Sequence, residues 1–143
     1  MIVIDVNVVL AAHRGDHPLH APVRRWFDDL VSGGTDFGIP LLVWGSFLRL
    51  ATNRRIFGVP TPLGEAFDFI EAVRAQPGHV PVEPGDRHLT LLRRISTDAA
   101  AQGDLVPDAL LAAIAIENGA DIASLDRDFA RFPGLVILRP DRV

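Results

Sequence analysis

Acidic side chains stand directly after two predicted strands of this sequence and at the start of a predicted helix. Asp5 follows the β-branched run Ile2–Ile4, and Asp126 follows the apolar run Ile122–Leu125. Parallel strands of an open α/β sheet end at one edge, and ligands bind beyond that edge. If both strands are central and parallel, Asp5, Asp108, Asp126 and Asp128 are expected to converge on one pocket there, and Asn7 stands two residues after Asp5.

Asp108 reaches the same region from a helix. Pro107 has a first-turn position, the apolar run 109–116 favours a helix, and Gly119 stands where a C-terminal glycine belongs. Asp108 is therefore expected at a helix N-terminus, shortly before the strand that leads to Asp126 and Asp128.

Carboxylates in such a group are most simply explained by a bound cation. They repel each other and lose solvation when they are gathered in one pocket, unless a cation neutralises them. Oxygen ligands without cysteine or a histidine pair suit Mg²⁺ or Mn²⁺. Each acid alone has another interpretation, since Asp126 and Asp128 could simply start a short helix at Arg127. The joint pattern favours the metal site.

The sequence resembles the PIN domains, and within them the VapC toxins of bacterial VapBC toxin–antitoxin pairs. The resemblance covers nearly the whole chain. Its strongest segments are the opening MIVIDVNVVL, the middle FLRLATN, the block LVPDALLAAIAIENGA and the ending SLDRDFARFPGL.

This resemblance implies a metal-dependent endoribonuclease that hydrolyses RNA phosphodiester bonds. It implies that Asp5, Asp108 and Asp126 are catalytic acids that hold Mg²⁺ or Mn²⁺, with Asp128 as a further ligand and Asn7 as a supporting group. It also implies an RNA substrate, a cognate VapB-type antitoxin whose C-terminal segment covers the site, and a homodimer.

One position departs from the family pattern. Many members carry a glutamate just before the counterpart of Phe47, where this chain has Trp44-Gly45-Ser46 and no acid. Ser46 is the best match, and its neutral hydroxyl can offer only a weak or water-mediated contact. This departure puts a second metal ion in doubt more than the first, and Asp104 is the nearest acid that could compensate.

Three arginines are candidates for contact with RNA phosphates. Arg49 lies three residues after Ser46, on the same face of the predicted helix. Arg54 and Arg55 precede Phe57, so the arginines could bind a single-stranded backbone while the ring stacks on a base. The alternatives are an ion pair or structural anchor for Arg49 and a solvated helix end for Arg54 and Arg55.

The composition excludes several classes of protein. The net charge of −4 argues against nucleic-acid binding by bulk positive charge, so such binding must be local. The 14 basic residues are all arginine, and a P-loop NTPase needs a phosphate-binding lysine. The absence of cysteine, of a membrane-spanning run and of a signal peptide predicts a cytoplasmic protein without membrane contact.

Strands and helices alternate along the chain, which predicts one domain over residues 1–143. The expected fold is α/β, a three-layer α/β/α sandwich around a mostly parallel central sheet of four to five strands. A polar loop is expected at 11–18 and an edge strand at 79–83. Further helices are expected near 17–31, 41–52, 63–75 and 87–101, and a last strand at 135–138.

Two other functions remain open from the residues alone. The same acids could serve a phosphohydrolase that acts on DNA or on a small phosphoester. The chain could also be a PIN-like module that binds RNA or a partner without cutting, because the helix glutamate is missing.

Overall fold

The computed structural model describes residues 1–142 and contains a four-stranded, wholly parallel sheet. In chain order the elements are β1 (Ile2–Ile4), α1 (Val6–His13), α2 (His20–Ser32), β2 (Phe37–Gly38), α3 (Leu41–Ala51), α4 (Leu63–Arg74), α5 (His88–Asp98), η1 (Gly103–Leu105), α6 (Val106–Glu117), β3 (Asp121–Ala123), η2 (Arg127–Arg131) and β4 (Ile137–Leu138).

The sheet order β2-β1-β3-β4 puts β1 and β3 side by side at the centre. Their register pairs Ile2 with Asp121 and Ile4 with Ala123, so the two strands end together. The chain leaves β1 toward β2 on one side and leaves β3 toward β4 on the other. This change of direction is a topological switch point, the place where open α/β sheets bind ligands.

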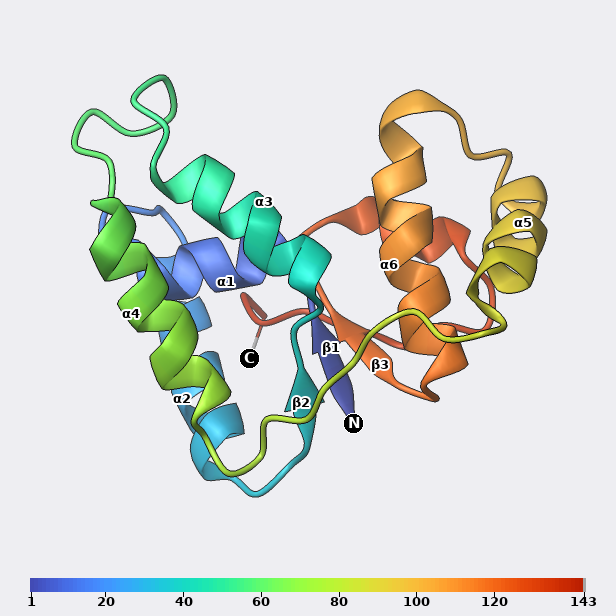
Figure 1. Cartoon of the computed structure of the whole chain (residues 1–143), viewed down its shortest axis with the longest axis horizontal. Helices are drawn as coiled ribbons and strands as arrows, with labels where there is room; N and C mark the ends of the chain where they lie inside the picture. Colours follow the sequence, from blue (N-terminus) through green and yellow to red (C-terminus); the bar gives the residue numbers. More distant parts are fainter. Residues whose placement is uncertain (143) are drawn as a thin grey trace.

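Helices cover both faces of the sheet, which confirms the three-layer α/β/α sandwich. Figure 1 shows α1 to α4 grouped on one side of the strands and α5 and α6 on the other. Helix α6 is apolar around most of its surface because it packs between the sheet and α5. Gly119 ends α6 in the left-handed region, at φ 62°, as predicted for a cap glycine.

Two local predictions were wrong. The loop expected at 11–18 begins later, because α1 continues to His13 with Val8, Val9, Ala11 and Ala12 fully buried. The segment 79–83 forms no named strand and makes only one isolated bridge, between His79 and Phe37. Pro81 has no backbone N–H to donate, so the ladder cannot extend through this segment.

Candidate metal centre

Asp5 is the first polar residue after β1, and it is 8% exposed. Its Oδ1 accepts a hydrogen bond from the Val6 amide (2.7 Å), which caps α1. Its Oδ2 accepts a second bond from the Ser124 hydroxyl (2.8 Å). Burial raises the pKa of Asp5, and the Ser124 and Val6 bonds only partly oppose this. The carboxylate is thus fixed in orientation and short of compensating charge.

Ser124 joins the two central strand ends and is fully buried. Besides donating to Asp5, its Oγ accepts bonds from the Asp126 amide (2.9 Å) and from Asn7 Nδ2 (3.3 Å). Asn7 Oδ1 in turn accepts from the Leu125 amide (3.1 Å). Asn7 therefore lies in the same hydrogen-bond network as Asp5. Ser124 was not among the predicted site residues, although a hydroxyl in an apolar run two residues before an acid was an available signal.

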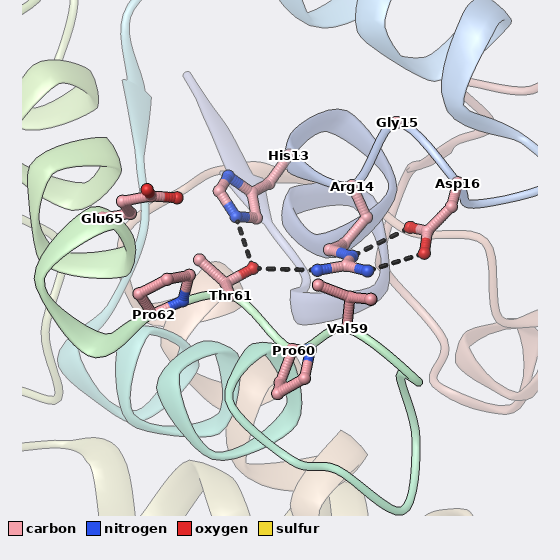
Figure 2. Close-up of a pocket in the computed structure, with 9 residues that line it drawn as sticks. All are labelled: His13, Arg14, Gly15, Asp16, Val59, Pro60, Thr61, Pro62 and Glu65. Carbon is pink, nitrogen blue, oxygen red and sulfur yellow. Dashed lines mark hydrogen bonds and ion pairs between the residues drawn. The ribbon is translucent and has the colours of Figure 1, made fainter.

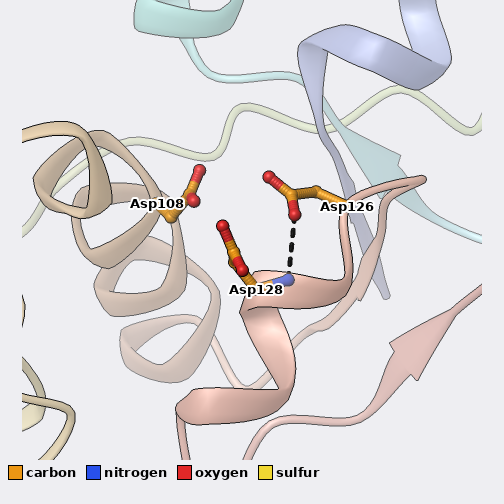
Figure 3. Close-up of side chains that lie close together, drawn as sticks. All are labelled: Asp108, Asp126 and Asp128. Carbon is orange, nitrogen blue, oxygen red and sulfur yellow. Dashed lines mark hydrogen bonds between the residues drawn. The ribbon is translucent and has the colours of Figure 1, made fainter.

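Asp108, Asp126 and Asp128 form an acidic cluster at the same edge. Each offers one carboxylate oxygen, and these oxygens lie within 4.8 Å of one another. Figure 3 shows Asp108 on α6 pointing toward Asp126 and Asp128 on the segment that opens η2. Asp126 Oδ1 accepts a bond from the Asp128 amide (2.9 Å), so Asp126 also caps η2. The short helix at Arg127, which was the alternative interpretation of these two acids, is present together with a cluster of three of the four acids.

The electrostatics of Asp108 reflect this crowding. Desolvation raises the pKa of Asp108 to about 6, and repulsion from Asp126, Asp5 and Asp128 adds to the shift. The neighbouring carboxylates thus oppose the ionisation of Asp108. Three half-buried to exposed carboxylate oxygens at this spacing form a hard anionic donor set, which fits a divalent cation such as Mg²⁺ or Mn²⁺. Asp5 lies beside this set rather than within the 4.8 Å group.

A cavity of about 170 Å³ connects Asp5 and Asp108 to helix α3. Ser46 and Arg49 line it, so both residues lie where the sequence comparison expected them. Asp104 is exposed in η1 and belongs neither to this cavity nor to the acidic cluster. Among the described residues, Asp5 and Asp108 are thus the acids that line this cavity, and helix α3 contributes none.

Arg54 and Arg55 lie elsewhere, exposed in the turn after α3. The ring of Phe57 is not free on both faces, because the Arg14 guanidinium carbon lies 4.0 Å above its centroid. The base-stacking arrangement expected for this segment is thus obstructed on one face.

A separate polar pocket of about 370 Å³ contains Arg14, between the end of α1 and the loop before α4 (Figure 2). Arg14 pairs with Asp16 (2.6 Å) and donates to Thr61 Oγ1 (3.2 Å), which also contacts His13 Nε2 (3.0 Å). None of the clustered acids lines this pocket. The bonds among Arg14, Asp16, Thr61 and His13 connect the end of α1 to the loop before α4.

A family model for the PIN domain matches residues 2–135. The chain therefore belongs to the PIN-domain family, and the curated relatives that it matches include VapC ribonucleases. It is 59% identical to ribonucleases VapC25 and VapC31 of Mycobacterium tuberculosis over 140 residues, which cover 98% of this chain and 99% of each relative. It is 40% identical to ribonuclease VapC43 of the same species, over 92% of this chain and 90% of the relative.

Solved structures show the same fold at low sequence identity. VapBC2 from Rickettsia felis, bound to a DNA fragment from its promoter, matches with a TM-score of 0.71 and 14% identity over 96% of this chain and 98% of that one. VapC20 of M. tuberculosis, a sarcin-ricin loop cleaving toxin, matches with a TM-score of 0.68 and 19% identity. The match covers 98% of this chain and 100% of that one. Within residues 1–142, no helix is long and apolar enough to span a bilayer.

Proposed function

We propose that this protein is a divalent-metal-dependent endoribonuclease, the toxin of a type II toxin–antitoxin pair. The observation that carries the proposal is the acidic cluster at the β1/β3 switch point, with Asp108, Asp126 and Asp128 within reach of one cation. The ribonuclease names of relatives at 59% identity support the same activity. We infer that residues 1–143 act as one functional domain.

In this proposal Asp108, Asp126 and Asp128 hold Mg²⁺ or Mn²⁺, with Asp5 as the fourth acid of the pocket. When bound, such an ion neutralises phosphate charge and lowers the pKa of water. The protein's own part is to orient the acids. Ser124 fixes Asp5 and the Asp126 backbone in one network, and Arg49 brings a positive charge into the cavity beside Asp5 and Asp108. A guanidinium there can pair with a phosphate of the substrate.

Partners follow from the same comparisons. The neighbouring solved structures include toxins in complex with their antitoxins, such as VapBC2 from R. felis. This supports a VapB-type antitoxin for the present chain. We propose that the antitoxin covers the cavity lined by Asp5 and Asp108. We also propose that the protein forms a homodimer, as the family resemblance implies.

The test compares RNA and DNA strands of the same sequence, incubated with the purified protein and Mg²⁺ or Mn²⁺. RNA should be cut and DNA left intact, and a chelator should stop the reaction. Asp5→Asn should abolish cleavage, because it removes a charge that helps to hold the metal while circular dichroism shows a folded protein. Cleavage of DNA alone would favour a phosphohydrolase of another substrate class.

A protein that binds RNA with metal but never cuts it would instead be a binding module. The specific observation behind this second candidate is Ser46, a neutral residue in the cavity where the family pattern expects a glutamate.

An Asp5→Asn protein that cuts RNA at the wild-type rate would contradict the proposed site.

A further inference from the structure

A second cavity adjoins the acidic cluster on the side of β4. Its volume is about 430 Å³, and its lining contains Asp126 together with Arg127, Arg139 and Arg142. We call it the arginine cavity. It gathers three of the protein's 14 basic residues beside a metal-binding acid, in a chain of net charge −4. A protein of negative net charge can bind a polyanion at such a local concentration of guanidinium groups.

The backbone fixes the arginine cavity next to the acids. Strand β4 pairs in parallel with β3, and the Ser124 amide donates to the Leu138 carbonyl (3.1 Å). Asp126 and Arg139 therefore emerge from neighbouring strand ends at the same edge of the sheet. The Arg142 amide donates a hydrogen bond to the Arg139 carbonyl (3.1 Å), which closes a turn after β4. Arg142 therefore lines the same cavity as Arg139.

Arg139 is held in a fixed orientation. Its Nε and one terminal nitrogen donate to the two carboxylate oxygens of Asp141, both at 3.1 Å, and its side chain is 22% exposed. A guanidinium has five N–H donors, so donors remain for another acceptor. Arg127 and Arg142 are exposed. Guanidinium groups in this arrangement suit phosphate, which they bind through paired, charge-assisted hydrogen bonds.

We propose that the arginine cavity binds an RNA backbone phosphate next to the one that is cut. The inference rests on the proposed ribonuclease function and extends it by naming how the strand is positioned. Carboxylates alone repel RNA, so the strand needs basic contacts on either side of them. Arg49 lies in the cavity of Asp5 and Asp108, and Arg127, Arg139 and Arg142 lie in the cavity of Asp126.

The experiment measures binding of a fluorescently labelled single-stranded RNA of mixed sequence at several salt concentrations. All proteins carry Asp5→Asn so that the RNA stays intact. Arg142→Gln and Arg127→Gln should each weaken binding several-fold and lower the slope of log K against log salt by about 0.7. Arg93→Gln, on the exposed surface of α5, makes the same charge change and should leave the slope unaltered.

Arg139→Lys keeps the charge but loses the paired geometry, so it should weaken RNA binding while its melting temperature stays near that of the parent. Mn²⁺ titration of Arg142→Gln, made for this purpose without Asp5→Asn, should give the wild-type affinity, which separates phosphate binding from metal binding. If the parent binds RNA and the cavity variants keep the parental slope, the arginine cavity is contradicted and the ribonuclease proposal stands. If the Asp5→Asn parent binds no RNA and the wild-type protein cuts none, both proposals fail.

Discussion

Ser46 lines the cavity of Asp5 and Asp108, and it is the position at which this chain departs from the family pattern. A carboxylate at this position would add a hard oxygen ligand, or a support for one, to the existing acids. Ser46→Glu should therefore bind Mn²⁺ roughly tenfold more tightly, as measured by isothermal titration.

The matched control for Ser46→Glu is Gly45→Glu. It adds the same charge one residue earlier in α3, where a Cβ meets no other atom within 4 Å and the residue is exposed. Equal gains in both variants would mean that general charge, and not a ligand at Ser46, tightens the binding. No gain in either would mean that the Ser46 position cannot reach the ion.

Asp108 should give the protein a pH dependence. Its pKa is raised from 3.8 to about 6, so the native state keeps a proton that the unfolded chain releases. Without metal, stability is therefore lost as the pH rises from about 4 through about 6. Asp108→Asn cannot ionise, and its melting temperature in chelator should exceed that of the wild type by a margin that grows over this range and then levels off.

The same titration bears on metal binding. Protons compete with the ion for Asp108, so the Mn²⁺ affinity of the wild type should rise with pH through about 6. Asp98→Asn removes an exposed acid on α5 and serves as the control for the melting experiment. A difference in melting temperature between Asp108→Asn and wild type that stays constant from pH 4 to 7 would contradict the raised pKa.

The positions of the acids after the strands were predictable from sequence, as was Asn7 beside them, whereas the part played by Ser124 was not. Asp5 and Asp126 each follow a β-branched or apolar run, and that local pattern survives in the structure as β1 and β3. Ser124 acts through hydrogen bonds to Asp5 and Asn7, which lie 119 and 117 positions away from it in the sequence. No local pattern encodes such contacts, because they arise only when β1 and β3 pair.

Among the elements, α1 and the segment 79–83 show where local patterns mislead. The run after Asp5 is apolar except for Asn7 and His13 and has neither the period of a strand nor that of an amphipathic helix. The Asp5 cap and burial against α2 and α3 select the helix. The segment 79–83 alternates like a strand, yet it runs close to β2 and its backbone bonds to that strand are confined to Phe37.

Gly38 in β2 makes that close crossing possible. A Cβ at Gly38 would lie 2.1 Å from a Val82 methyl carbon and 2.9 Å from the Val80 carbonyl oxygen. Gly38→Ala should therefore destabilise the protein by about 1–3 kcal/mol in urea unfolding. Gly45→Ala, in an exposed turn of α3 with open space around it, should instead stabilise by about 0.5–1 kcal/mol. A Gly38→Ala protein with wild-type stability would show that the 80–82 segment can move away from β2.

Across the whole molecule, the fold class was evident from the alternation of strands and helices, but the strand order was not. The order β2-β1-β3-β4 depends on which way each crossover turns, and it is this order that puts Asp5 and Asp126 at a switch point. The distribution of charge likewise becomes visible only in three dimensions. A chain of net charge −4 places arginines in both cavities that adjoin its acids.

The central claim is that the fold gathers Asp108, Asp126 and Asp128 to hold a divalent cation, and titration of Mn²⁺ into the purified protein tests it most directly. The wild type should bind Mn²⁺ at a saturable site, and Asp126→Asn should weaken this binding by at least about tenfold. Asp98→Asn removes the same charge at the last residue of α5, outside the acidic cluster, and should bind Mn²⁺ like the wild type. A wild-type protein that takes up no Mn²⁺, or an Asp126→Asn variant that binds it equally well, would contradict the account.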